Sequence, residues 1–149
     1  MRARLALYAV LGLTLTLSWY LQAAAPEMTV YKESTCGCCN QWVERLRANG
    51  FSVTVREVPH TADYSRKNGV PDALHGCHSA TVDGYTIEGH VPAADIRRLL
   101  QERPNAKGLA VPGMPRGAPG MEGSAKDPYS VLLFDAEGHT TVYAKYAGD

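Results

Sequence analysis

Four cysteines are the residues of this chain best suited to chemistry: Cys36, Cys38, Cys39 and Cys77. Three of them lie within four consecutive positions, just ahead of a run with helical spacing. Unpaired backbone N–H groups and the positive end of the dipole at a helix N-terminus lower the pKa of a thiol, and the resulting thiolate is both a nucleophile and a metal ligand. The cluster therefore predicts either thiol–disulfide exchange or the binding of a soft metal ion.

The spacing within this cluster leaves both chemistries open. Cys36 and Cys39 form a C-x-x-C pair, so they share one face of a first helical turn and can form a disulfide or hold one cation together. In a regular helix Cys38 would point away from Cys36. It joins the same site only if Cys36 lies in the loop before the helix, an arrangement that Ser34 and Thr35 would allow as helix caps.

The surrounding pattern predicts the elements that position these thiols. A strand at 28–32 leads into the cysteine cluster and a helix that ends at Asn49-Gly50, a second strand follows at 51–58, and a short helix at 61–68. Strands at 79–82 and 85–88 flank an Asp83-Gly84 turn, and a third helix begins at Pro92 and ends before Pro104. This β-α-β-α-β-β-α order predicts an α/β, thioredoxin-like core with a central sheet covered by helices.

The last part of the chain lies beyond that core. Residues 108–123 form a loop rich in glycine and proline that contains Met114 and Met121. Strands at 131–135 and 140–146 then predict a C-terminal β-hairpin around Glu137-Gly138. A loop of this length in a compact domain is usually functional or disordered.

The hairpin register places the distant cysteine. A two-residue Asp83-Gly84 turn sets Val82 opposite Tyr85, and the same register, extended, sets Cys77 opposite His90. In the predicted fold the start of this strand packs beside the loop that opens the first helix. Cys77 and His90 are therefore expected to approach the other three cysteines.

The N-terminal residues predict export. Residues 1–25 contain Arg2 and Arg4, an apolar run and then three alanines, the layout of a secretory signal peptide, and an uncleaved membrane anchor is the alternative. Residues 26–149 then form one domain that works in the periplasm, where disulfides and metals are both accessible. Without Arg2 and Arg4 the chain carries 13 basic and 15 acidic residues, so it lacks the basic excess of a nucleic-acid binder. It also lacks a glycine-rich phosphate-binding motif.

Several kinds of cysteine site compete. Two disulfides are the plain alternative, but a bridge between neighbours such as Cys38 and Cys39 is strained. Structural zinc sites usually present two pairs of ligands, whereas the second half of this site is a single cysteine flanked by histidines. Thiolates with thioethers nearby suit Cu(I) better, and Met114 and Met121 could supply the thioethers.

The histidines and aromatic residues are weighed in the same way. His90 is favoured as a ligand by the register, and either His75 or His78 could face the site because they bracket Cys77. His60 and His139 are interpreted as ordinary surface residues. Trp42 and Phe134 are expected in the core.

Three stretches together resemble a known family. They are TCGCCNQWVERLRANGF, GVPDALHGCHSATVDGYTIEGHVPAADIRRLL and GLAVPGMPRGAPGMEG, and from about Met28 to Tyr146 the chain is similar to the exported CopG-like metal-binding domains of bacterial copper resistance. The resemblance implies a thioredoxin-like fold, Cu(I) held by the four cysteines, a methionine-bearing loop with Met114 and Met121, and a role in copper detoxification alongside other periplasmic copper-handling proteins.

One departure from thioredoxin-like oxidoreductases bears on function. Those enzymes place a cis-proline just before the third core strand, where it shields the cysteines, whereas this chain reads Gly76-Cys77-His78-Ser79. A thiol in that place favours metal capture over dithiol exchange. The leading hypothesis is a periplasmic copper-binding protein with a metal site formed by Cys36, Cys38, Cys39, Cys77, His90, Met114 and Met121.

Two rival functions remain. The first is a thiol–disulfide or copper-linked oxidoreductase that cycles Cys36 and Cys39 through a disulfide. The second is a stable, disulfide-bonded interaction module. No residue is assigned a catalytic role at this point.

Overall fold

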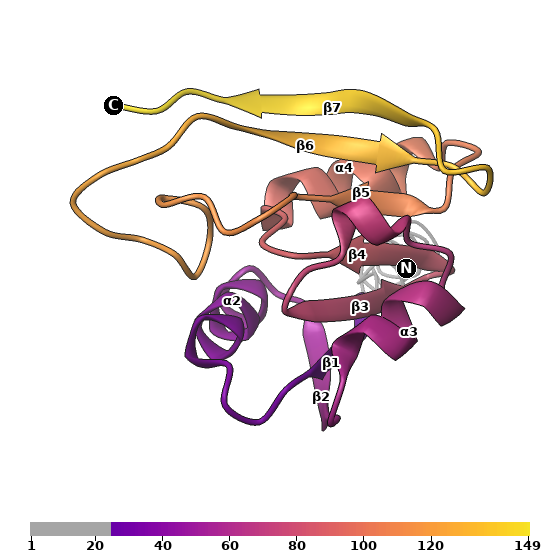
Figure 1. Ribbon diagram of the computed structural model, residues 1–149, viewed down its shortest axis with the longest axis horizontal. Coiled ribbons are helices and arrows are strands. Elements are labelled where there is room, and N and C mark those ends of the chain that lie inside the picture. The colour runs from indigo at the N-terminus through magenta and orange to yellow at the C-terminus, as the bar shows by residue number, and fades with distance from the viewer. Residues whose placement is uncertain (1–24) are drawn as a thin grey trace, which may run out of the picture.

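The computed structural model describes residues 25–149 (Figure 1). The predicted signal at 1–25 therefore lies, apart from its last residue, outside the described part of the chain. No helix among the described residues is long and apolar enough to cross a membrane.

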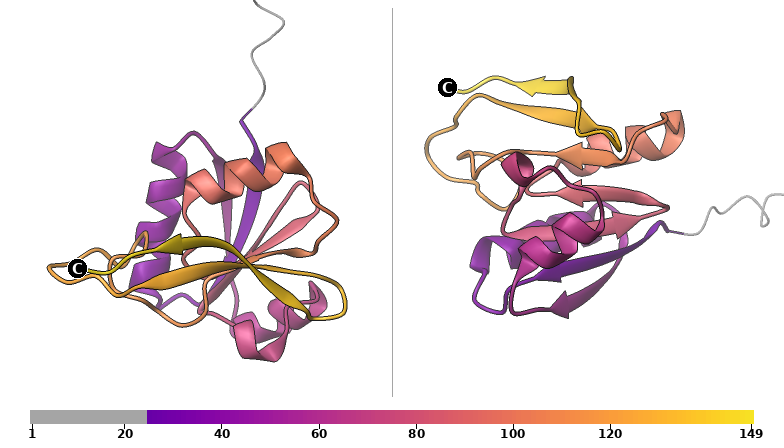
Figure 2. Two further views of the ribbon diagram at one scale, coloured as in Figure 1. Left: turned by 90° about the horizontal axis from the view of Figure 1, so that it is seen from above. Right: turned by 45° about the vertical axis from the view of Figure 1, so that its right-hand side comes forward.

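One seven-stranded sheet runs through the molecule in the order β2-β1-β3-β4-β5-β6-β7. Its strands are β1 (Glu27–Lys32), β2 (Ser52–Glu57), β3 (His78–Val82), β4 (Tyr85–Glu88), β5 (Gly108–Ala110), β6 (Tyr129–Phe134) and β7 (Thr140–Tyr146). The helices are α2 (Gly37–Ala48), α3 (Thr61–Lys67), α4 (Ala93–Glu102) and the 3₁₀ turn η1 (Asp72–Leu74). Helices α2 and α4 cover one face of the sheet and α3 the other (Figure 2). The predicted thioredoxin-like order of elements and the C-terminal hairpin are confirmed.

The β3–β4 hairpin has the predicted register. Val82 pairs with Tyr85, and the pairing continues to Ser79 opposite Glu88. Asp83 and Gly84 both have positive φ, 48° and 85°, as a tight two-residue turn of the hairpin type requires.

One strand was not predicted. The sequence assigned residues 108–123 to a single loop, but Gly108–Ala110 form β5, which pairs in parallel with β4 and antiparallel with β6. A side chain at Gly108 would place its Cβ 1.7 Å from the carbonyl oxygen of Thr86, so glycine is required there. Through β5 the C-terminal hairpin continues the central sheet and does not form a separate layer.

The N-terminus of α2 also differs from expectation. Ser34 and Thr35 do not cap the helix; Cys36 is the N-cap, and its Sγ accepts a hydrogen bond from the backbone N–H of Cys39 at 3.3 Å. The cysteine sulfur can take the role of a capping hydroxyl here because the first-turn N–H groups lack helical partners. Cys36 thus lies just ahead of the helix, the condition under which Cys38 joins the site.

The core lies between the sheet and the helices α2 and α4. Trp42 is fully buried there, and its indole Nε1–H donates to the carbonyl oxygen of Val91 at 2.9 Å. Phe134 is buried in a second, smaller cluster with Val70 and Leu74. Both aromatic residues occupy the core, as predicted.

Candidate metal centre

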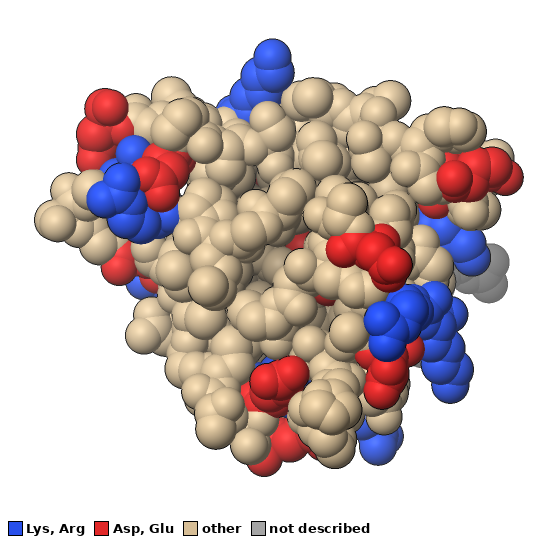
Figure 3. All heavy atoms as spheres, viewed as in Figure 1, with Lys and Arg blue, Asp and Glu red and all other residues tan. Residues whose placement is uncertain are grey.

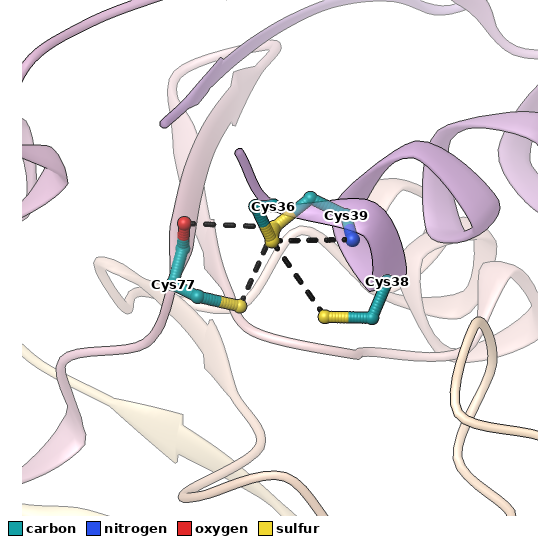
Figure 4. A group of neighbouring side chains, drawn as sticks. All are labelled: Cys36, Cys38, Cys39 and Cys77. Carbon is teal, nitrogen blue, oxygen red and sulfur yellow. Dashed lines mark hydrogen bonds between the residues drawn. A yellow bond between two sulfur atoms is a disulfide. The ribbon is translucent and has the colours of Figure 1, made fainter. Parts of the chain in front are cut away.

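The structure brings the sulfur atoms of all four cysteines together (Figure 4). Their Sγ atoms lie within 4.8 Å of one another. Cys36 and Cys39 form a disulfide, while Cys38 and Cys77 are free thiols. Cys38 Sγ lies 3.6 Å from Cys36 Sγ, and Cys77 Sγ lies 3.4 Å from Cys39 Sγ. Each free thiol therefore faces one half of the disulfide.

Two chain segments build this cluster. The loop after β1 and the first turn of α2 supply Cys36, Cys38 and Cys39, and Cys77 stands immediately before β3. β1 pairs antiparallel with β3, with Lys32 opposite His78, so the end of β1 and the start of β3 lie next to each other at the same end of the sheet. The approach of the distal cysteine to the other three, predicted from the sequence, follows from this pairing.

The Cys77 thiol is held in its protonated form. Partial burial, followed by the nearby Cys38, raises its pKa from 9.0 to about 12. A metal that binds Cys77 as thiolate must therefore displace a proton, and its binding is expected to strengthen as the pH rises. Proton release on metal addition, followed in weakly buffered solution, measures this coupling.

Two buried histidines direct bare ring nitrogens toward Cys77. His78 Nε2 lies 2.9 Å from the carbonyl oxygen of Gly89, and His90 Nδ1 lies 2.8 Å from that of Pro119. A carbonyl can only accept, so each of these nitrogens carries the proton. The opposite nitrogens, His78 Nδ1 and His90 Nε2, lie 3.5 and 3.9 Å from Cys77 Sγ. The neutral tautomers thus leave both lone pairs available at the cluster.

Burial keeps these rings neutral. It lowers the pKa of His78 from 6.5 to about 3, aided by the nearby His90, and lowers that of His90 too. The His78 ring packs against Trp42 with centroids 4.3 Å apart and meets the His90 ring edge-on at 4.9 Å. Neutral imidazole is the metal-binding form, so both rings are in the protonation state that a metal ligand requires.

The other histidines lie elsewhere. His75 Nε2 donates to the carbonyl oxygen of Val70 at 3.1 Å, so of the two residues that bracket Cys77 it is His78 that faces the cluster. His60 is exposed. His139 is also exposed and pairs with Asp135 across the β6–β7 turn. Sequence reasoning could not choose between His75 and His78, because alternation along a strand does not apply to Cys77, which precedes β3.

The segment between β5 and β6 covers the first turn of α2, next to the cysteine cluster. Besides the bond from His90 to Pro119, Gly120 packs so closely on α2 that an added Cβ would lie 2.8 Å from Cys38 O and 2.7 Å from Trp42 N. Glu122 accepts a hydrogen bond from Arg45 of α2 at 2.8 Å. These contacts tie the glycine- and proline-rich loop to the helix at whose N-terminus three of the cysteines lie.

The two predicted methionines occupy different surroundings. Met121 is partly buried and directly follows Gly120, which touches the first turn of α2. Met114 is 59% exposed. It lines a surface groove of about 410 Å³ with Pro112, Pro115, Pro128, Tyr129, Ser130 and Leu132. Met121 thus adjoins the residue that packs on α2, whereas Met114 lies on the exposed surface of the same loop.

Charged groups are dispersed over the face that contains α2 and α3 (Figure 3). Lys and Arg side chains lie mainly toward its margin and are mixed with Asp and Glu, while uncharged side chains fill its centre. Electrostatic attraction of a large polyanion is not favoured on this face.

Replacing Gly120 with alanine is expected to lift the loop from the cluster. The new Cβ would overlap backbone atoms of α2, and φ is +84°, so we expect a loss of about 1–3 kcal/mol in the free energy of unfolding, measured by urea denaturation. Gly113→Ala is the matched control, because Gly113 has φ of +72° but no atom within 4 Å of its would-be Cβ. Equal losses in the two variants would show that the contact with α2 contributes nothing.

Comparison with known proteins agrees with this geometry. A family model described as "Protein of unknown function, DUF411" matches residues 74–121, and no curated protein matches the chain. The solved structure "Copper resistance protein copG- Form 2" is 42% identical, with a TM-score of 0.78, and the match covers 82% of this chain and 98% of that one. "Copper resistance protein copG- Form 1" is 43% identical with the same TM-score and the same coverage. The chain therefore belongs to the CopG-like family of copper resistance proteins.

Proposed function

We propose that this protein binds Cu(I) in the periplasm as part of copper resistance. In this proposal residues 1–25 direct export, and Cys36, Cys38, Cys39 and Cys77 hold copper as thiolates once the Cys36–Cys39 disulfide is reduced. Other copper-handling proteins of the periplasm then act as donors or acceptors of the ion.

The observation that carries the proposal is the meeting of four sulfur atoms within 4.8 Å. Cu(I) is a soft ion that prefers thiolate and thioether ligands, and Cys39 is buried among the four, which excludes water from one side of the site. The family relationship to copper resistance proteins supports copper over zinc.

Nitrogen and thioether ligands complete the proposed site. His90, and with it His78, offers a bare nitrogen next to Cys77, while Met121 and Met114 belong to the covering loop. We assign Met121 to the site's edge and Met114 to the surface where copper enters or leaves, since its thioether is exposed.

X-ray absorption at the copper edge tests this assignment directly. Reduced protein loaded with Cu(I) anaerobically should give the edge of a monovalent ion and a first shell dominated by sulfur, with a smaller nitrogen contribution. His90→Asn should remove part of the nitrogen shell, whereas His75→Asn should leave the spectrum unchanged. A shell of nitrogen and oxygen alone would contradict the proposal.

A copper-linked oxidoreductase is the second candidate, and the Cys36–Cys39 disulfide beside two free thiols is the observation that favours it. In that reaction the two reduced thiols lose their protons, each sulfur gives one electron to a Cu(II) ion, and the S–S bond forms as two Cu(I) ions are produced. A dithiol reductant would restore the two thiols by thiol–disulfide exchange, in which the reductant is itself oxidised to a disulfide.

Stoichiometry separates the two candidates. Fully reduced, metal-free protein mixed anaerobically with Cu(II) should yield two Cu(I) ions for each new disulfide if it acts as a reductase, as measured with a Cu(I)-specific chelator and a thiol count. Reduction without disulfide formation would contradict this second function and leave simple binding.

A further inference from the structure

A buried carboxyl group lies directly beneath the loop that carries Cys77. Glu88 ends β4 and is fully buried. Its Oε1 accepts a hydrogen bond from the backbone N–H of Gly76 at 2.6 Å, one residue before the distal thiol. The sequence offered no indication of this role, because Glu88 reads there as the last residue of a hairpin strand.

Helix α3 supplies two further polar contacts around Gly76. Ser65 Oγ–H donates to the same Oε1 of Glu88 at 3.0 Å, and Thr61 Oγ1 lies 3.5 Å from the carbonyl oxygen of Gly76. Ser65 and Thr61 are both buried polar residues on the sheet-facing side of α3. The N–H and the carbonyl of Gly76 therefore both contact polar side chains on the sheet face that α3 covers, opposite to α2.

Steric contact leaves this loop little freedom. A Cβ on Gly76 would lie 3.3 Å from both Cα and N of Gly89, and one on Gly89 would lie 2.7 Å from the carbonyl oxygen of Val111. The backbone before Cys77 thus packs tightly against the end of β4, and the hydrogen bond from Gly76 to Glu88 fixes its position relative to the sheet.

Stability alone does not account for a carboxyl group in this position. Its other oxygen, Oε2, is buried, as is Ser79 Oγ on the facing residue of β3, and neither atom makes a hydrogen bond of normal geometry, although Ser79, like Ser65, partly offsets the rise in the pKa of Glu88. Burial raises the pKa of Glu88, which reports the cost of taking this group out of water. An apolar side chain would avoid that cost, since partly satisfied buried polar groups are less favourable than well-packed apolar ones.

We infer that Glu88 is a positioning residue for the metal centre: through the Gly76 N–H it holds Cys77 so that its sulfur faces Cys39. This inference rests on the proposed function for its purpose, but the placement of Cys77 can be tested without copper. Glu88 does not itself contact the cluster sulfurs; it acts through the backbone on which Cys77 is carried.

The test compares Glu88→Leu with Glu88→Gln. Leucine removes the acceptor of the Gly76 N–H, whereas the glutamine carbonyl retains it. In reduced, metal-free protein, iodoacetamide should modify Cys77 of Glu88→Leu about tenfold faster than in the unaltered chain, as expected when a hydrogen bond to a carboxylate is lost. Cys38, counted by mass spectrometry in the same molecules, serves as the internal reference, and Glu88→Gln should restore the original Cys77-to-Cys38 ratio.

A second arm reports the consequence for copper. Glu88→Leu should bind Cu(I) about tenfold more weakly in competition with bathocuproine disulfonate, and Glu88→Gln should not. If the unaltered protein binds no Cu(I), the proposed function fails, while the alkylation arm still decides the role of Glu88. Asp95→Ala is the control for general destabilisation, because Asp95 is a buried acid that bonds to Tyr146 on the C-terminal hairpin.

Three results would overturn the inference: an unchanged Cys77-to-Cys38 ratio in Glu88→Leu, equal acceleration in Glu88→Gln, or equal acceleration in Asp95→Ala. Should Glu88→Leu fail to fold, hydrogen exchange at the Gly76 amide decides the matter in the unaltered protein and in Ser65→Ala. Slow exchange of the Gly76 amide in the unaltered protein and faster exchange in Ser65→Ala support the inference. Rapid exchange in the unaltered folded protein refutes it.

Discussion

Cys77→Ser is expected to weaken Cu(I) binding by at least about 100-fold, because loss of a supporting group outside the ligand shell alone costs 10–100-fold. Cys77 is the only cysteine supplied by the β3 side of the site, and a serine hydroxyl is a hard, neutral ligand that Cu(I) binds poorly. Competition with a Cu(I) chelator under anaerobic, reducing conditions measures the change.

His75→Asn is the control for this variant. His75 lies two residues from Cys77, but its ring bonds to the carbonyl of Val70 and not to the cluster. Its copper affinity should match that of the unaltered chain. Retention of full affinity by Cys77→Ser would place the metal on the three cysteines at the N-terminus of α2 alone and would refute the four-sulfur site.

Acid is expected to destabilise the metal-free protein through His78. The pKa of this buried ring falls from 6.5 to about 3 on folding, so the unfolded chain binds the proton more tightly and stability is lost as the pH drops from 6.5 toward 3. Over this window the free energy of unfolding should fall by on the order of 4 kcal/mol from His78 alone. Urea unfolding at a series of pH values gives this slope.

His78→Gln isolates the contribution. Glutamine can donate to Gly89 but does not titrate, so the variant's stability should depend less steeply on acid pH than that of the unaltered chain. The raised pKa of Glu88 acts in the opposite direction, and it is present in both proteins, so it cancels in the comparison. His60→Gln, at an exposed position, should leave the slope unchanged; parallel curves for all three proteins would contradict the assignment to His78.

Local patterns predicted most of the architecture. The Asp83-Gly84 turn fixes its register because only a few turn conformations fit two residues between strands. Cys77 does approach His90, as predicted, although the strand pairing ends at Ser79 and Glu88 and does not extend to these two residues. β5 was missed because three residues, Gly108–Ala110, show no periodicity. They form a strand through their partners β4 and β6, which are distant in sequence.

The cysteines of the site were predictable from the sequence, whereas the residues that position them were not. Cysteine is rare, so its positions alone suggested the cluster. Ser65 and Glu88 look like ordinary helix and strand residues until α3 and β4 pack on opposite sides of Gly76. The capping of α2 by Cys36 instead of Ser34 or Thr35 was likewise beyond prediction, since several residues in a row could serve and the choice depends on where β1 ends.

The order in which the site's parts occur along the chain constrains when the metal can be loaded. Cys39 and Cys77 are 38 residues apart, and the covering segment ends still later, with Glu122 bonded to Arg45. A growing chain thus presents its first three sulfurs well before the fourth one and the covering segment exist. We expect that early metal capture by those three would give a shallow, easily exchanged adduct, and that tight retention begins only after synthesis has passed the β5–β6 connection and the domain has closed.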